Sequence, residues 1–313
     1  MPPVLGCIAD DFTGGSDLAG TLVRSGLRTL QTIGVPRHGV EPGVEAVVVS
    51  LKTRSDPVQD AIQRSLEALI WLQSLGCRQF YFKYCSTFDS TPAGNIGPVT
   101  DALMDALGAE ITVCCPAFPA NHRTIYKGNL FVGDVPLAES SMRFHPLTPM
   151  LDSNLVRLLT PQTRRKVGLI DYEVVRNGAD AIQKRLAVLK SEGVGITVVD
   201  ALCNADLMSI GGACADLRLV TAGSGLALGV AAQLTAQREM PVEQASRLPR
   251  IGGFSAVIAG SCSAATLPCA RTCSTGGTAP IDIEVLNLAG ATDLAVTVGG
   301  VLRRTIMVNS RSA

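Results

Sequence analysis

The sequence predicts an α/β protein built on a mostly parallel sheet flanked by helices. Short apolar runs typical of buried parallel strands alternate with amphipathic runs typical of helices over most of the 313 residues. Polar clusters follow several of the apolar runs, as they do at the carboxyl ends of strands in open α/β sheets. Because 313 residues exceed the usual length of one domain, we expect two.

The apolar runs predict the strands. The first begins the chain at "VLGCIA", and each of the others is separated from the next by turn residues or a helical pattern. The predicted strands are Val4–Ala9, Thr29–Val35, Ala46–Lys52, Gln79–Cys85, Ile111–Pro116, Lys166–Ile170, Gly195–Cys203, Leu217–Thr221 and Ser255–Gly260.

Helices are predicted between these strands. In the first unit Gly14 and Gly15 are expected to form a sharp turn, after which Ser16 or Asp17 caps a helix. The clearest helical pattern follows Asp56, a candidate cap, and stops at Gly76. The apolar face of this helix consists of Val58, Ile62, Leu66, Leu69 and Leu72. Further helices are predicted at Pro98–Leu107, Asn154–Leu159, Ala181–Leu189 and Leu226–Ala236.

Two segments interrupt the alternation. Residues 118–149 contain no long helical pattern, and "TIYKGNLFV" within them predicts a hairpin that turns at Lys127 and Gly128. Such an excursion is typical of a lid or binding loop. Residues 238–250 are polar and contain two prolines, so we expect a linker there, between a domain at 1–237 and a partial second α/β domain at 251–313.

Composition excludes several classes of protein. With 47% hydrophobic residues the chain can form a core, and with 27 basic and 27 acidic residues it carries no global field that would attract nucleic acid or an anionic membrane. No apolar segment approaches 18 residues and no basic region precedes the first apolar run, which predicts a cytoplasmic protein. The ten cysteines include no CxxC pair and indicate buried, reduced thiols, and the three histidines lack metal-site spacing, so we predict no metal site.

Four strand ends carry candidate chemistry. Asp10 and Asp11 lie at the end of the first strand, Arg54 at the third, Lys83 and Asp89 at the fourth, and His122 and Arg123 at the fifth. Parallel strands bring these ends to one edge of the sheet, where carboxylates could act as bases and cations could hold an anionic substrate, as phosphoryl transfer to a small acid requires. Each residue also has a structural alternative: capping for the aspartates, a solvated loop after Lys83, and an ordinary loop histidine at His122.

Two glycine patterns are similar to nucleotide-binding motifs. "GSDLAGT" has the P-loop glycine spacing but Thr21 replaces the lysine, so it is not a Walker A loop. Gly223, Gly225 and Gly229 approximate a dinucleotide fingerprint with one residue too many, which leaves a tightly packed glycine turn as the alternative to an NAD-dependent oxidoreductase.

Long stretches together resemble the four-carbon acid sugar kinase family, and within it the branch that acts on 3-oxo-tetronate. They run from the N-terminus to about Thr266: "IADDFTGGSDLAG", "FKYCSTFDSTPAGNIGPV", "CPAFPANHRTIYKGNLFVG", "LTPMLDSNLVRLLTPQT" and "VIAGSCSAAT". The resemblance implies an N-terminal sugar-acid-binding domain and a C-terminal ATP-binding domain. It implies ATP- and Mg²⁺-dependent phosphorylation of the terminal hydroxyl of a four-carbon acid sugar such as 3-oxo-tetronate, giving the 4-phosphate.

Individual residues are assigned roles. From their position at a strand end near the predicted cations, Asp11 is expected to be the general base and Asp10 to orient substrate or metal, and the resemblance implies that Ser261, with Ser263, contacts ATP. The predicted substrate-binding residues are Arg54, Lys83, Asp89, Ser90, Asn95 and His122. The expected partners are the small-molecule sugar acid and a second copy of the chain in a homodimer, with neither nucleic acid nor membrane.

Beyond Thr266 the sequence departs from the family's pattern. "GGTAP" and "VGGVLRR" do not match the glycine-rich "GGETSG" segment that grips the nucleotide in the family. We therefore expect a truncated or divergent nucleotide-binding region at 251–313 and weak binding of ATP. A catalytically impaired sugar-acid-binding remnant is the alternative to an active kinase.

Overall fold

The computed structural model describes residues 2–145, 147–236, 258–259, 281–284 and 306–309. The chain divides into two compact units, residues 1–247 and 248–313. The predicted linker at 238–250 lies outside the described residues.

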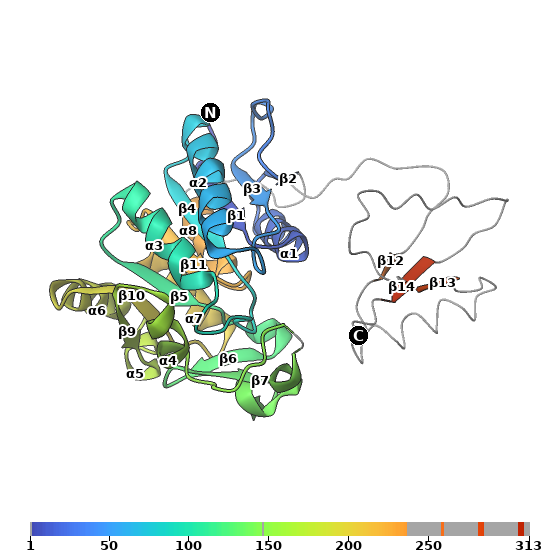
Figure 1. Ribbon diagram of the computed structural model, residues 1–313. Coiled ribbons are helices and arrows are strands. Elements are labelled where there is room, and N and C mark those ends of the chain that lie inside the picture. Colours follow the sequence, from blue (N-terminus) through green and yellow to red (C-terminus); the bar gives the residue numbers. More distant parts are fainter. Residues whose placement is uncertain (1, 146, 237–257, 260–280, 285–305, 310–313) are drawn as a thin grey trace. The chain divides into compact units, whose positions relative to one another are not determined.

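An eight-stranded sheet forms the centre of the first unit (Figure 1). Every pairing between its neighbouring strands is parallel, in the order β2-β3-β1-β4-β11-β5-β10-β9. The strands are β1 (Leu5–Ala9), β2 (Thr29–Ile33), β3 (Ala46–Ser50), β4 (Gln79–Lys83), β5 (Thr112–Cys115), β9 (Lys166–Ile170), β10 (Val194–Val199) and β11 (Leu219–Ala222). The predicted fold class is confirmed.

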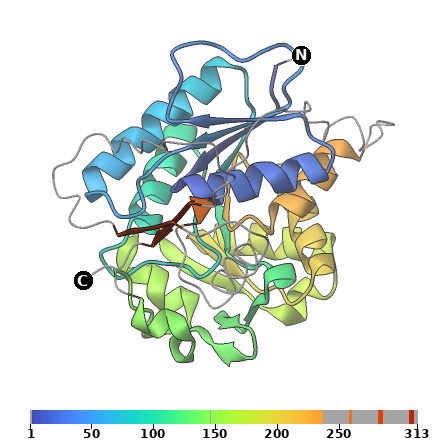
Figure 2. The same ribbon diagram turned by 90° about the vertical axis from the view of Figure 1, so that its right-hand side faces the viewer.

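Helices cover both faces of this sheet. α2 and α3 pack on one face, and α1 packs on the other beside α8, with α7 and α6 following along the sheet. Figure 2 shows α2 and α1 on opposite sides of the first strands. The helices are α1 (Phe12–Arg24), α2 (Val58–Ser74), α3 (Ile96–Leu107), α4 (Leu155–Leu159), α5 (Tyr172–Val175), α6 (Ala179–Ser191), α7 (Asn204–Ala213) and α8 (Ala227–Thr235). α5 and α7 were not among the predicted helices.

The central strands are buried on both faces because helices cover both. Every residue of β1, β3 and β4 is buried, which explains why these strands are mainly apolar and do not alternate, with polar residues only at the ends of β3 and β4. The prediction of β9 is exact, whereas β10 ends at Val199 rather than Cys203. The largest buried side chains lie on and just after β4, among them Tyr81, Tyr84 and Phe88.

The start of α1 differs from the prediction. The helix begins at Phe12, and its cap is Asp11, whose Oδ1 accepts the Gly14 N–H at 3.1 Å. Gly14 and Gly15 therefore lie inside the first turn of the helix instead of forming a turn before it, and the predicted caps Ser16 and Asp17 are wrong. Glycine is required here because neighbouring side chains pack against the helix: a Cβ on Gly14 would clash with Asp11 and Lys83, and one on Gly15 with Ser50.

The start of α2 also corrects a prediction. Asp56 does not cap the helix, because the cap position is Pro57 and no side chain bonds the first turn. Asp56 instead accepts a hydrogen bond at 2.7 Å from Arg64, which lies almost two turns into the helix. The predicted stop at Gly76 is confirmed by its φ of +91°, which favours glycine.

The excursion at residues 118–149 contains short elements only. β6 (Arg123–Tyr126) and β7 (Asn129–Val132) form the predicted antiparallel hairpin, and β8 (Val135–Pro136) extends it. Lys127 and Gly128 have φ values of 51° and 74°, the left-handed pair that a two-residue turn of this kind needs. Three single-turn helices, η1 (Pro119–Asn121), η2 (Leu137–Glu139) and η3 (Ser141–Phe144), complete the segment, and η4 (Thr160–Gln162) follows α4.

The described part of the second unit is a parallel three-stranded sheet in the order β12-β14-β13. Its strands are β12 (Ile258–Ala259), β13 (Ile281–Glu284) and β14 (Ile306–Asn309). A partial second region thus follows the first unit. Across the described residues, the helices are all too short or too polar to span a membrane.

Candidate active site

The carboxyl ends of β1 and β4 form a topological switch point. β1 leads through α1 to β2 on one side of the sheet, whereas its neighbour β4 leads through α3 to β5 on the other side. Crevices at such points are the usual ligand sites of open α/β sheets. The Asp10 N–H donates to the Lys83 carbonyl at 3.0 Å, so the polar residues that follow the two strands start side by side.

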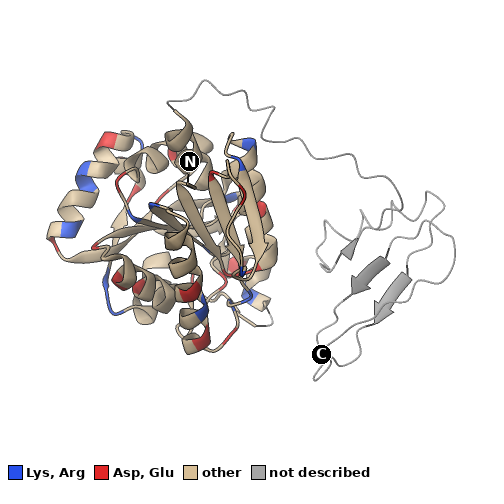
Figure 3. Ribbon diagram, turned by 90° about the horizontal axis from the view of Figure 1, so that it is seen from above, with Lys and Arg blue, Asp and Glu red and all other residues tan. Residues whose placement is uncertain are grey.

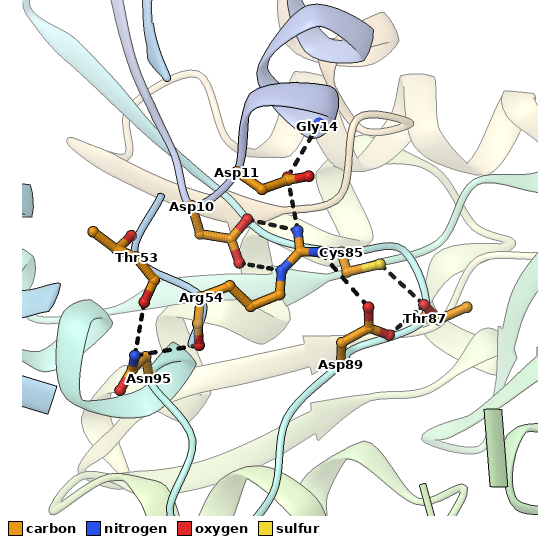
Figure 4. Close-up of polar contacts among 9 residues, drawn as sticks. All are labelled: Asp10, Asp11, Gly14, Thr53, Arg54, Cys85, Thr87, Asp89 and Asn95. Carbon is orange, nitrogen blue, oxygen red and sulfur yellow. Dashed lines mark hydrogen bonds and ion pairs between the residues drawn. The ribbon is translucent and has the colours of Figure 1, made fainter. Parts of the chain in front are cut away.

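Arg54 gathers three carboxylates at this point (Figure 4). Its Nε and Nη2 donate to the two oxygens of Asp10 at 2.9 and 2.8 Å, and Nη2 also donates to Oδ1 of Asp11 at 2.7 Å. Its Nη1 lies 3.6 Å from Oδ2 of Asp89. These four residues, which we call the Arg54 cluster, come from three different strand ends, as predicted from the parallel sheet.

Burial changes the pKa values of Asp10 and Arg54, the two residues joined by the two-point bond. Desolvation raises the pKa of the Asp10 carboxyl group, although the hydrogen bond and charge of Arg54 and the charge of Lys83 lower it. Desolvation lowers the pKa of Arg54, but its hydrogen bond and charge interaction with Asp10 outweigh this and raise it above its usual value. Arg54 therefore stays cationic, and Asp10 is held by a two-point bond that fixes its orientation.

Asp11 differs from Asp10 in having a free oxygen. Its Oδ1 accepts from both the Gly14 N–H and Arg54, whereas no hydrogen bond to its Oδ2 occurs among the described residues. Its side chain is 26% exposed against 7% for Asp10. Asp11 is thus an oriented carboxylate with one oxygen open to a ligand.

Lys83 is a buried cation at the same point. Only 3% of the residue is exposed, yet within the described residues its ammonium makes no hydrogen bond or ion pair. It acts on Asp10 through charge alone. A buried ammonium without a partner is costly unless a ligand supplies one.

Asp89 is supported by its own loop. Its Oδ1 accepts from Thr87 at 2.6 Å, and the Thr87 hydroxyl lies 3.0 Å from the sulfur of Cys85. Phe88 between them is buried with a φ of 52°, a conformation uncommon for an aromatic residue. Cys85 was not among the predicted site residues.

Two predicted binding residues support neighbouring backbone. Ser90 is buried and donates to Oε1 of Gln162 at 3.0 Å. Asn95 donates through Nδ2 to the carbonyl oxygens of Thr53, Arg54 and Asp56, so it holds the loop that carries Arg54. Both residues lie near the Arg54 cluster, and the side chain of each already donates hydrogen bonds to other residues of the chain.

The other predicted residues lie apart from the Arg54 cluster or beyond the described residues. His122 is exposed, precedes β6 with a φ of 57°, and makes no hydrogen bond to the cluster in the described part of the chain. Ser261 and Ser263 lie outside the described residues.

Asp200 is a carboxylate that the sequence analysis missed. It is fully buried at the carboxyl end of β10 and accepts the N–H groups of Lys127, Gly128 and Tyr172 at 2.6, 2.8 and 2.9 Å. It thereby joins the hairpin turn to the start of α5. The predicted strand ran through Cys203 and hid this residue, whereas an end at Val199 would have placed Asp200 at the same edge as Asp10.

The glycines after β11 serve packing. A Cβ on Gly225 would lie 2.4 Å from the Ala117 carbonyl oxygen, and one on Gly229 would lie 2.0 Å from that of Leu207. This matches the glycine-turn alternative to a dinucleotide fingerprint.

Comparisons with known proteins agree with this architecture. A family model described as "Sugar-binding N-terminal domain" matches residues 5–230, which include all of the Arg54 cluster and Lys83. The chain belongs to this family. It is also 57% identical to a protein named 3-oxo-tetronate kinase from Burkholderia multivorans over 265 residues, 84% of this chain and 62% of that protein. The chain therefore spans less than two thirds of that relative.

Solved structures share the family's fold. A structure from Salmonella typhimurium LT2 has a TM-score of 0.83 and 40% identity, and the match covers 99% of this chain and 75% of that one. A DUF1537 protein from Bordetella bronchiseptica, described as a domain-swapped dimer with bound citrate, has a TM-score of 0.65 and 26% identity over 90% of this chain and 67% of that one. The predicted resemblance to the sugar acid kinases is confirmed.

Proposed function

We propose that this chain binds a four-carbon sugar acid at the Arg54 cluster and Lys83 and serves the ATP-dependent phosphorylation of its terminal hydroxyl. The observation that carries the proposal is an oriented carboxylate with one open oxygen near a buried ammonium that has no hydrogen bond or ion pair among the described residues, at the switch point of a sugar-binding domain. The relatives named 3-oxo-tetronate kinase support 3-oxo-tetronate as the acid, and its 4-phosphate as the product.

Lys83 is the residue we assign to the substrate carboxylate. An ammonium buried without an acceptor binds a carboxylate more strongly than an exposed lysine can, because no water competes. Nε and Nη2 of Arg54 already donate to Asp10 and Asp11, so its Nη1 is the nitrogen with which it could assist. The citrate bound to the Bordetella relative supports a carboxylate ligand for this family.

Asp11 is the residue we assign as general base. As the O4–P bond forms and the bond between the γ-phosphorus and the β-phosphate oxygen breaks, the O4 proton passes to Oδ2 of Asp11, which has no other partner among the described residues. Asp10 holds Arg54, and through it the orientation of Asp11. This assignment uses the more exposed of the two carboxylates.

ATP and Mg²⁺ are the proposed cosubstrate and metal ion. Among the described residues, His, Cys, Asp and Glu side chains form no cluster of three or more that could hold a metal. In kinases Mg²⁺ is bound by one or two carboxylates together with substrate phosphates, and it neutralises charge on the transferred group. Ser261 and Ser263 remain the proposed ATP contacts, and the domain-swapped Bordetella relative supports a homodimer.

A phosphoryl-transfer assay tests the proposal. The chain is incubated with Mg-ATP and a panel of four-carbon acids, including 3-oxo-tetronate and the stereoisomers of tetronate, with the neutral polyol erythritol as control. We expect ADP release and a 4-phosphate with at least one acid and none with erythritol. Binding of an acid in calorimetry without any transfer would favour the binding-only alternative, which the comparisons do not support.

A further inference from the structure

Gly14 occupies the point on which Lys83 and Asp11 converge. A Cβ built on Gly14 would lie 2.4 Å from Nζ of Lys83 and 2.3 Å from Oδ1 of Asp11. Both distances are far below van der Waals contact, so the two side chains fill the volume that any larger residue would need. The absent side chain of Gly14 is what lets the ammonium lie against the first turn of α1.

This arrangement places two positive features together. The amino end of α1, a helix of 13 residues, carries partial positive charge, and a cation beside it is unfavourable. Lys83 is nevertheless 97% buried there without a hydrogen bond or ion pair in the described chain. The N–H groups of Phe12 and Thr13 also lack an acceptor among the described residues. The Asp11 carboxylate caps this helix end through the Gly14 N–H, and a further anion is a ligand that the ammonium and the remaining N–H groups would both stabilise.

We propose that Gly14 is a positioning residue: its missing side chain lets the ammonium of Lys83 lie against the first turn of α1, where it binds the carboxylate of the sugar acid. The inference rests on the proposed function. It adds that specificity for an acid over a neutral sugar depends on a glycine, and that Gly14 affects the affinity for the acid through Lys83 rather than by touching the substrate.

An alanine at position 14 is expected to change the positions of the binding side chains without preventing the chain from folding. Gly14 is helical and has an ordinary φ, so Gly14→Ala favours the helix itself. The atoms that the new methyl would meet belong to the ends of two side chains, which can rotate away. The variant is therefore expected to fold while Lys83 and Asp11 leave their positions.

The test compares Gly14→Ala with Gly20→Ala. Gly20 lies in the same helix, and a Cβ there would meet only Nη1 of Arg24 at 3.3 Å. Calorimetric titration with tetronate is expected to show affinity at least about tenfold weaker for Gly14→Ala and unchanged for Gly20→Ala, because a charge-assisted bond is lost only in the first. A Gly14→Ala affinity equal to that of the wild type would overturn the proposal.

A double-variant cycle tests whether Gly14 acts through Lys83. Gly14→Ala in the Lys83→Ala chain is expected to weaken tetronate binding no further than Lys83→Ala alone, whereas additive losses would contradict the proposal. If Gly14→Ala lowers the melting temperature, Lys83→Ala is expected to restore part of it, and a loss that it does not relieve would also contradict the proposal. A wild-type chain that binds no four-carbon acid would refute the proposed function itself.

Discussion

Charged residues lie both at the amino ends of the sheet's strands, here called the amino edge, and at their carboxyl ends, the carboxyl edge, but they differ in burial and in partners. At the amino edge, a cavity of about 760 Å³ lies near the starts of β9 and β10 and the end of α6, and it is lined by Arg164, Arg165, Lys166, Lys190 and Glu110. Arg165 pairs with Asp105 at 2.6 Å and Lys190 with Glu110 at 2.5 Å. Arg164 also pairs with Asp105. Along the helices of the first unit, positive and negative segments are interspersed (Figure 3).

The difference lies in burial and in the partner of each cation. The side chains of Arg164 and Lys190 are 65% and 47% exposed and have carboxylate partners, so water and the chain already satisfy them. Lys83 at the carboxyl edge is 3% exposed and has no partner within the described chain. A large cavity with paired surface charges is thus a solvated face, whereas the buried charge of Lys83, which has no partner among the described residues, is what supports the proposed ligand site.

The largest expected effect is on turnover at the carboxyl edge. Asp11→Asn keeps a good helix cap but removes the base, so we expect the phosphoryl-transfer rate to fall about 10²- to 10⁴-fold. Asp105→Asn, which changes a carboxylate of the amino edge, is expected to leave the rate unchanged. Steady-state kinetics with tetronate and ATP measures both, and wild-type turnover in Asp11→Asn would exclude it as the base.

The next effect concerns the affinity for the sugar acid. Lys83→Ala removes the unpaired ammonium, and because a charge-assisted hydrogen bond is worth about 1.5–3 kcal/mol, the Kd for tetronate should rise about tenfold or more. Lys190→Ala is the matched change at the amino edge and should leave the Kd unaltered. Titration calorimetry measures the Kd of each variant for tetronate, and equal Kd values would contradict the prediction that only the carboxyl edge binds the acid.

A smaller effect is expected on stability near the Arg54 cluster. Asn95→Ala leaves the carbonyl oxygens of Thr53, Arg54 and Asp56 without their donor, which should lower the free energy of unfolding by about 1–3 kcal/mol. Exposed Asn177, which donates one bond to the Glu173 carbonyl, provides the control, and its alanine variant should change stability by less than about 0.5 kcal/mol. Urea unfolding curves compare them, and similar losses would mean that Asn95 does not brace the loop.

The smallest effect is a difference in thiol reactivity between the two ends of β4. Burial, with the charge of Asp89, raises the pKa of Cys85 to about 11, and burial raises the pKa of Cys77 at the amino end to about 12. Both thiols are protonated at neutral pH, so their alkylation by iodoacetamide should accelerate as the pH rises towards these values, Cys85 first. Peptide mapping by mass spectrometry measures the order, with exposed Cys203 as the early reference. Reaction of Cys77 before Cys85 would contradict the predicted order.

Local pattern accounts for much of the fold. The apolar runs predicted the central strands because a parallel strand buried on both faces lacks alternating polar positions, and Lys127-Gly128 predicted its hairpin because few residue pairs adopt that turn. The same rules failed at the start of α1, where Asp11 rather than Ser16 caps the helix. Capping depends on which residue the chain presents as it leaves the strand, and several residues there were equally suitable.

By itself the sequence determined the fold class, the family and the strand ends that carry Asp10, Asp11, Arg54 and Lys83, because strand periodicity and the position of polar residues after each strand are local properties. Only the tertiary structure decided which of these residues pair with one another and which are buried. Strand order made β1 and β4 neighbours, which paired Arg54 with three carboxylates and left Lys83 without a partner among the described residues. Burial and partner choice arise from contacts between residues distant in the chain, and no pattern within one segment encodes them.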